Sequence, residues 1–159
     1  MPRSTHPYVW TDEGWLYLAT VIDLFARRVV GWSAADHMRD ELVLDAVHDA
    51  FERRAKPSGF EGLIFHSDRG SQYASNRFIE TLEARGIRRS MSPPADCWSN
   101  GVAESFFATL KKELIYREDY PTRAAAMASI EEYIERFYNP TRRHSTNEYL
   151  SPIARENVG

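Results

Sequence analysis

The order of short apolar runs and longer amphipathic segments is the feature that most constrains the fold of this chain. Residues 15–22 form a continuous apolar and aromatic run that ends in β-branched residues and favours a strand. Residues 23–26 predict a turn, and residues 28–33 predict the second strand of a hairpin. Residues 39–54 carry apolar side chains at helical spacing, and the short bounded run 62–65 predicts a buried strand. Strands followed by alternating helix and strand predict an α/β domain.

The second half of the sequence contains two further helix starts. Ser75 and Thr122 are predicted to be N-caps, because a hydroxyl there can accept from the first free amides of a helix. The expected buried stripes are Phe78, Ile79 and Leu82 in the first helix, and Ala126, Ile130, Ile134 and Phe137 in the second. Gly86 should end the first helix before a short edge strand at 87–91. Residues 92–99 are rich in turn formers and predict a loop that leads into the next helical segment.

Composition limits the class of protein. At 159 residues, with 43% hydrophobic residues, the chain can form one domain, expected to span 1–159. No run approaches the roughly 18 apolar residues that cross a bilayer, so no membrane span and a cytoplasmic location are expected. The single cysteine, Cys97, excludes an internal disulfide and a thiolate metal cluster. The net charge of -3 does not by itself indicate nucleic-acid binding, although the basic residues are unevenly placed.

Two acids, Asp68 and Glu104, lie with 35 residues between them, each inside a local pattern, His-Ser-Asp-Arg-Gly-Ser-Gln-Tyr and Asn-Gly-Val-Ala-Glu-Ser-Phe-Phe. Asp68 follows the expected strand 62–65, and Glu104 lies in a helical pattern. Carboxylates from a strand end and a helix can share a divalent ion of the kind that activates phosphoryl transfer. In the alternative interpretation, Asp68 only begins a turn and Glu104 only occupies the first turn of a helix.

Five segments in this order resemble the catalytic core of bacterial insertion-element transposases, second-reading-frame (OrfB) type, whose core is similar to retroviral integrases. Besides the two acid patterns, the resemblance rests on residues 15–32, residues 106–114, and the motifs Tyr-Asn, Arg-Arg-His-Ser and Tyr-Leu-Ser-Pro between 138 and 152. It implies a ribonuclease H-like α/β fold with a mixed central sheet flanked by helices.

The resemblance also implies a function, namely metal-dependent cleavage at transposon ends and transfer of a 3'-hydroxyl to a DNA phosphodiester. Asp68 and Glu104 would be catalytic metal ligands for Mg²⁺ or Mn²⁺, with two ions in the intact enzyme. The expected partners are double-stranded DNA at element ends and target, and further copies of the chain. An end-binding helix-turn-helix module would come from a missing segment or a second protein.

The first residues depart from the family pattern. The family carries a third acid on its first strand, within Asp-x-Thr-Tyr, and aligning Tyr8 with that tyrosine places Thr5 at the acid and Pro7 at the threonine. Residues 1–7 are therefore expected to be a non-homologous start of an N-terminally truncated core, and residues 140–159 a C-terminal extension. The rival hypothesis is a catalytically dead fragment that only binds DNA or transposase partners.

Several residues near the acids are candidate DNA contacts. Lys111 lies seven residues after Glu104, two helical turns, so both project from one face. The resemblance implies that Lys111 contacts terminal DNA; alternatively it is a solvated lysine, and Lys112 beside it is a second basic candidate. Asn100 either caps the helix or touches DNA, with capping expected as its main role.

The remaining candidates have structural alternatives. Arg69 can reach a phosphate or pair with an acid, and Arg142 and Arg143 are either phosphate contacts or part of a solvated tail. His66 is expected to form structural hydrogen bonds. Asp23 is not expected to replace the third acid, because the family has both residues.

Overall fold

The computed structural model describes residues 8–54, 59–67, 75–91 and 97–159, with the backbone alone at residues 91 and 97–100. Strands β1 (Tyr8–Thr11), β2 (Gly14–Ile22) and β3 (Val29–Ala35) form an antiparallel sheet in that order. Strands β4 (Ile64–Ser67) and β5 (Arg88–Met91) form a second, parallel pair. The predicted hairpin is confirmed, because β2 pairs with β3 across the turn at residues 24–26.

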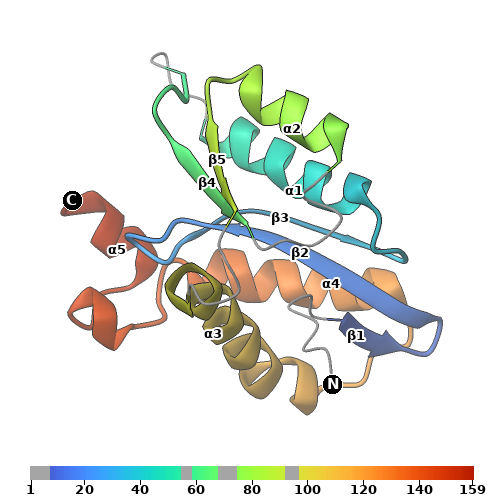
Figure 1. The fold of residues 1–159 in the computed structure, drawn as a ribbon. Coiled ribbons are helices and arrows are strands. Elements are labelled where there is room, and N and C mark those ends of the chain that lie inside the picture. Colours follow the sequence, from blue (N-terminus) through green and yellow to red (C-terminus); the bar gives the residue numbers. More distant parts are fainter. Residues whose placement is uncertain (1–7, 55–58, 68–74, 92–96) are drawn as a thin grey trace.

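Helices surround these strands, as Figure 1 shows. They are α1 (Asp40–Arg53), α2 (Asn76–Glu83), α3 (Cys97–Glu113), α4 (Arg123–Glu132) and α5 (Pro152–Asn157). Short turns of other helix types are η2 (Ile115–Arg117), η3 (Tyr133–Tyr138, a π-helix that continues α4) and η4 (Ser145–Asn147). In the described part of the chain, no helix has both the length and the apolar character needed to cross a membrane.

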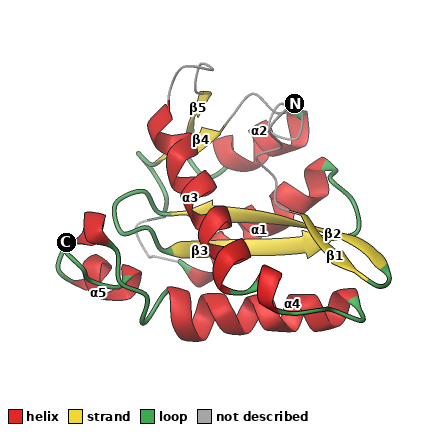
Figure 2. Ribbon diagram, turned by 90° about the horizontal axis from the view of Figure 1, so that it is seen from below, coloured by secondary structure: helices red, strands yellow, loops and turns green. Residues whose placement is uncertain are grey.

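The alternation of side chains along β2 divides the core into two layers. Leu16 and Leu18 are buried with residues of α3 and α4, whereas Ala19, with Tyr17 and Val21 partly buried, packs with residues of α1 and α2. Figures 1 and 2 show the same arrangement, with α1 and α2 on one face of the sheet and α3 and α4 on the other. Helices on both faces of a sheet define a three-layer α/β architecture.

Gly31 lets helix α1 approach the sheet closely. A Cβ atom at this position would lie 2.4 Å from the Ala46 carbonyl oxygen and 2.6 Å from the Ala50 amide nitrogen, both backbone atoms of α1. Only a residue without a side chain fits such a contact without moving the helix. The glycine therefore sets the distance between α1 and β3.

Both predicted helix caps are confirmed. The Ser75 hydroxyl accepts from the Phe78 amide at 3.2 Å, and the Thr122 hydroxyl accepts from the Ala125 amide at 3.0 Å. The stripe predicted for the last long helix is correct at Ala126, Ile130 and Ile134 but wrong at Phe137, which is 41% exposed. The π-helical turn widens the backbone spiral there, so Tyr138 takes the buried position.

The described strands form two sheets. Strands β2 and β3 belong to one sheet and β4 to another, and no ladder joins the two in the described part of the chain. The run 62–65 is not buried as predicted, because Leu63 is 54% and Ile64 is 48% exposed. Strand β1 pairs with β2 over only four positions, and β4 pairs with β5 alone among the described strands.

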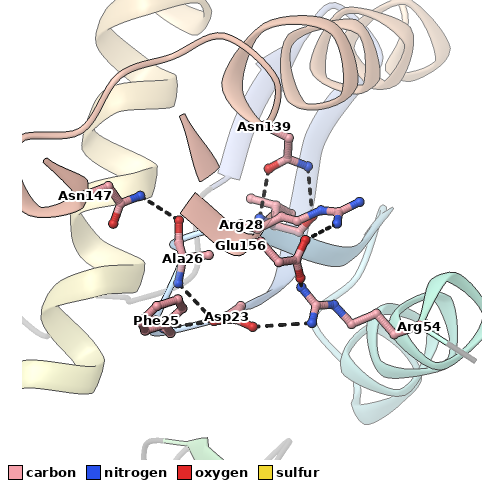
Figure 3. Close-up of polar contacts among 9 residues, drawn as sticks. Asp23, Phe25, Ala26, Arg28, Arg54, Asn139, Asn147 and Glu156 are labelled. Atoms are coloured by element: carbon pink, nitrogen blue, oxygen red, sulfur yellow. Dashed lines mark hydrogen bonds and ion pairs between the residues drawn. The ribbon is translucent and has the colours of Figure 1, made fainter. Parts of the chain in front are cut away.

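The C-terminal segment is tied to the β2–β3 turn by polar contacts (Figure 3). Buried Asn139 accepts from the Val29 amide and donates to the Val29 carbonyl, both at 3.0 Å. Buried Asn147 donates to the Ala26 carbonyl at 2.8 Å. Glu156 of α5 pairs with both Arg28 and Arg54. These contacts anchor the last part of the chain to its first hairpin.

Candidate active site

Of the two predicted acids, Glu104 lies on helix α3, and Asp68 comes directly after strand β4 in the sequence. Ser67, the last residue of β4, is buried, and Asp68 follows it directly. Asp68 and Arg69 themselves lie outside the described residues. The position of Asp68 relative to Glu104 thus stays a prediction.

Glu104 occupies an outward position on α3. Val102 and Phe106 lie two residues before and two residues after it on α3. Their side chains are 3% and 1% exposed and pack the helix against the core. The Glu104 side chain is exposed, and its carboxylate makes no hydrogen bond or ion pair with another residue of the described ranges. A carboxylate placed in this way can receive a cation or a donor from outside the chain.

Lys111 lies on the same face of α3 as Glu104, two turns later. Its ammonium nitrogen is 5.6 Å from the centre of the Tyr8 ring, within the range of a cation–π contact. Lys111 is half-buried, and Lys112 beside it is exposed. The described face of α3 therefore presents one carboxylate and one ammonium group, with the ammonium directed toward β1.

Helix α3 begins earlier than the sequence indicated. It starts at Cys97, so Asn100 lies within its first turn, and the expected role of Asn100 as an N-cap is wrong. A cap residue must precede the first helical residue to reach the free amides. The predicted loop is correspondingly shorter, because residues 97–99 are helical and residues 92–96 lie outside the described ranges.

Arg142 is held by Glu113 at the end of α3. The Arg142 Nε atom donates to both Glu113 carboxylate oxygens, at 3.0 and 3.1 Å, and the Tyr133 hydroxyl donates to the same carboxylate at 2.5 Å. Burial acts to raise the pKa of Glu113, but the hydrogen bonds from Arg142 and Tyr133 hold that pKa below its usual value. Arg143 is exposed. Of the two arginines, Arg142 is thus already engaged within the chain.

His144 is part of the same cluster. Its ring lies 5.2 Å from the Tyr138 ring, and its Nε2 atom is buried without a hydrogen-bond partner in the described structure. Burial, together with the nearby charges of Arg142 and Arg27, lowers the pKa of His144 to about 4. Sequence reasoning identified the Arg-Arg-His motif but not its partner Glu113, which is 29 residues away.

Asp23 stabilises the β2–β3 turn. One of its oxygens accepts from the amides of Phe25 and Ala26, at 2.9 and 3.1 Å, and the other lies 3.4 Å from Arg54. His66 is exposed on β4, and no described hydrogen bond supports the structural role expected for it. The described contacts of Asp23 give it a structural role at the β2–β3 turn.

Among the residues that the structure describes, no group of three or more His, Cys, Asp or Glu side chains is placed to hold a metal ion. Carboxylate oxygens are the ligands that Mg²⁺ and Mn²⁺ prefer, and the exposed carboxylate of Glu104, without a partner in the described ranges, fits that preference. Glu104 is one candidate ligand; its expected companion is Asp68.

The fold agrees with the sequence family of the chain. Residues 5–97 match one model of the integrase core domain, and residues 85–152 match a second. The first match covers more than half of the chain, so the protein belongs to the integrase core domain family.

Particular relatives extend this result. The chain is 46% identical over 145 residues to the transposase for insertion sequence element IS904 of Lactococcus lactis, covering 91% of this chain and 56% of the relative. It is 45% identical over 150 residues to the transposase InsF for insertion sequence IS3A of Escherichia coli, covering 94% and 51%. The chain thus spans about half the length of the curated relatives it matches.

Solved structures confirm the expected fold. The simian T-cell lymphotropic virus intasome in complex with PP2A regulatory subunit B56 gamma contains a chain with a TM-score of 0.70 and 16% identity, covering 93% of this chain and 50% of that one. The HTLV-2 integrase catalytic core domain in complex with magnesium has a TM-score of 0.66 and 16% identity, covering 94% and 90%. The fold is that of an integrase catalytic core, which is ribonuclease H-like.

Proposed function

We propose that this chain is the catalytic core of an insertion-element transposase that cleaves DNA at element ends and transfers a 3'-hydroxyl to another phosphodiester. The observation that carries the proposal is Glu104, which is exposed on a helix of an integrase-type core, has no partner among the described residues, and is separated from Asp68 by 35 residues of sequence. The transposases it resembles, at 45–46% identity, support the same reaction class.

In this proposal Asp68 and Glu104 are the metal ligands. A divalent ion held there would favour deprotonation of the attacking hydroxyl and stabilise the leaving oxygen. The magnesium bound in the HTLV-2 integrase core supports the choice of cation. Position 5 is the place of the third acid, and Thr5 offers only a neutral oxygen there.

The DNA would lie along the face of α3 that carries Glu104 and Lys111. Lys111 is the leading candidate for a phosphate contact, with Lys112, Arg143, Asn100 and Arg69 around it (Arg142 would have to leave Glu113 to join them). These contacts position the duplex without reading its sequence. Further copies of the chain and an end-binding module complete the proposed assembly.

A strand-joining assay tests the proposal. The substrate is a duplex with a pre-cleaved 3'-hydroxyl end, incubated with target DNA and Mg²⁺ or Mn²⁺. We expect little joining by the unaltered chain, because Thr5 leaves a deficit of ligand charge. Replacing residues 1–7 with an apolar strand that carries aspartate at position 5 should produce metal-dependent joining.

Substitutions in the grafted protein identify the ligands. Asp68→Asn and Glu104→Gln should each reduce joining by at least about 100-fold, the scale expected when a group that stabilises the transition state is lost. Glu80→Gln, at an exposed position on α2, is the matched control and should retain activity. Joining that survives Glu104→Gln would refute the proposed site.

A further inference from the structure

Two tryptophans lie exposed beside the β1–β2 turn. The antiparallel register pairs Trp10 with Trp15, and their side chains are 58% and 43% exposed. The two rings meet edge to face, with their centroids 4.9 Å apart. Such a pair holds both rings in place without covering them. Large aromatic side chains that stay exposed next to each other mark a candidate contact surface, here called the tryptophan patch.

The alternation of side chains along the strands explains why the patch is exposed. Val9 and Leu16 are buried with residues of α3 and α4, so Trp10 and Trp15 project to the opposite face of the sheet. Helix α1 covers that face around Ala19, but the β1–β2 turn extends past the helix (Figure 1). The described part of the chain therefore leaves the tryptophan patch uncovered.

The surface around the patch carries several carboxylates. Asp12 and Glu13, which form the turn between the two tryptophans, are both exposed. The Asp12 amide donates to the Tyr120 carbonyl oxygen at 3.0 Å, and this contact brings exposed Glu118 and Asp119 close to the same turn. Four carboxylates thus lie near the tryptophan patch.

The nearby arginines do not cancel this charge. Arg123 donates from Nε to the Trp15 carbonyl oxygen at 3.1 Å and lies 4.0 Å from the Glu13 carboxylate. Arg117 donates from Nε to the Lys112 carbonyl oxygen at 3.1 Å, toward the end of α3. Even with both arginines counted, the four carboxylates outnumber the cations. The patch therefore repels DNA phosphates and attracts a positively charged partner.

Ring faces beside carboxylates suit a guanidinium or ammonium group. Tryptophan is the aromatic residue whose ring face attracts a cation most strongly, and the carboxylates add ion pairs. The same row of rings already holds one cation, because Tyr8 lies 5.0 Å from Trp15 and the Lys111 ammonium lies 5.6 Å from the Tyr8 ring centre. An apolar partner would cover the rings but strip water from the carboxylates without pairing them.

We propose that the tryptophan patch and the carboxylates around it bind a polypeptide segment rich in arginine or lysine. Arginine side chains of the partner would stack on Trp10 and Trp15 while they pair with Asp12 and Glu13. This inference does not depend on the proposed reaction, because Glu104 takes no part in the contact.

A labelled peptide tests the proposal with the full chain. The probe is a fluorescein-labelled peptide of alternating arginine and glycine, and the control peptide carries citrulline, a neutral isostere, in place of each arginine. We expect saturable binding of the arginine peptide in fluorescence anisotropy, with an affinity that falls as salt rises. The chain has four tryptophans, so their indole N–H signals in NMR locate the contact. The signals of Trp10 and Trp15 should shift, and the other two should not.

Substitutions separate the contributions of rings and charges. Trp10→Thr should weaken binding of the arginine peptide about 5-fold or more, because a ring face is lost, whereas Trp10→Tyr should retain most of the binding. Asp12→Asn combined with Glu13→Gln should also weaken it. The matched control, Glu80→Gln combined with Glu83→Gln, makes the same change in net charge at exposed positions on α2 and should have little effect. Circular dichroism checks that each variant folds.

Four results would overturn the inference. One is equal binding of the arginine and citrulline peptides. Another is an equal loss in the two double variants, since the net charge of the protein would then be responsible. The third is peptide binding unchanged by Trp10→Thr, which would limit the tryptophans to stabilising the strands. The last is a shift of the Trp10 and Trp15 signals with duplex DNA but not with the peptide. The carboxylate variants keep the test decisive even if Trp10→Thr fails to fold.

Discussion

Glu113, Arg142 and Tyr133 show how a polar motif can serve the fold at the scale of single residues. The Glu113 carboxylate receives hydrogen bonds from both partners, so removing Arg142 would leave a partly buried carboxylate short of a donor. Arg143, next in the sequence, has an exposed side chain. The two arginines are equivalent in the sequence and different in the structure.

A comparison of two variants separates these roles. Arg142→Ala should lower the free energy of unfolding by about 1 to 2 kcal/mol, because a charged hydrogen-bonded pair is lost. Arg143→Ala should change it by less than about 0.5 kcal/mol. Urea denaturation measures both. Equal stability of the two variants would show that the Glu113 contact contributes little.

His144 should make the stability depend on pH. Its pKa is lowered to about 4 in the folded protein, from an ordinary value of 6.5, by burial and by the charges of Arg142 and Arg27, against the opposing charge of Glu113. Between pH 6.5 and about 4 the unfolded state binds the extra proton, so stability falls as the pH falls through this window. The loss is at most about 3 kcal/mol, and less because the ring is only half-buried.

Thermal unfolding at pH 7, 6 and 5 measures this effect. His144→Phe removes the titrating group while keeping an aromatic ring beside Tyr138, and it should flatten the decline over that range. If the variant and the unaltered protein lose stability in parallel, another group is responsible.

At the scale of elements, the sequence predicted correctly those features that depend on residues close together in the chain. The hairpin, the Ser75 and Thr122 caps and most of the stripe along α4 follow from residues within one or two turns of each other. Phe137 could not be predicted, because a π-helical turn changes the spacing that the stripe assumed. The division into two sheets depends on which strands meet across the whole chain, which periodicity does not encode.

Gly31 offers a test of the packing between α1 and β3. Gly31→Ala would place its Cβ within 2.4–2.7 Å of three atoms of α1, two of them backbone atoms, so we expect a loss of about 1 to 3 kcal/mol of stability. Gly101→Ala is the control, since nothing lies within 4 Å of a Cβ there and α3 should gain up to about 1 kcal/mol. Chemical denaturation distinguishes the two. If Gly31→Ala left the free energy of unfolding unchanged, α1 would be able to move away from β3 without cost.

At the scale of the whole molecule, the candidate site could be predicted only in part. The sequence identified Glu104 and Lys111 and placed them on one face of a helix, as the structure has them. It did not reveal the pairing of Arg142 with Glu113, since the two residues lie 29 positions apart in the chain. The assignment of Asp68 stays a prediction.

DNA binding should depend steeply on salt, because the proposed contacts are to phosphates. Lys111→Ala should weaken binding to unrelated duplexes alike and reduce the slope of log K against log salt by about 1. Arg77→Ala, on α2 across the sheet from α3, is the matched control and should leave the slope unchanged. Titrations by anisotropy at several salt concentrations measure the slopes. Affinity that is indifferent to salt would exclude phosphate contacts as its main source.

The contacts of Asn139 and Asn147 with the first hairpin have a consequence for synthesis on the ribosome. The bonded groups are 110 and 121 residues apart in sequence. During translation the hairpin emerges long before these asparagines. The backbone groups of Val29 and Ala26 therefore lack these hydrogen bonds until Asn139 and Asn147 have been synthesised. The nascent chain should therefore reach its final, protease-resistant state only after about residue 147 has left the exit tunnel. Stalled chains of increasing length, tested by limited proteolysis, would show that step.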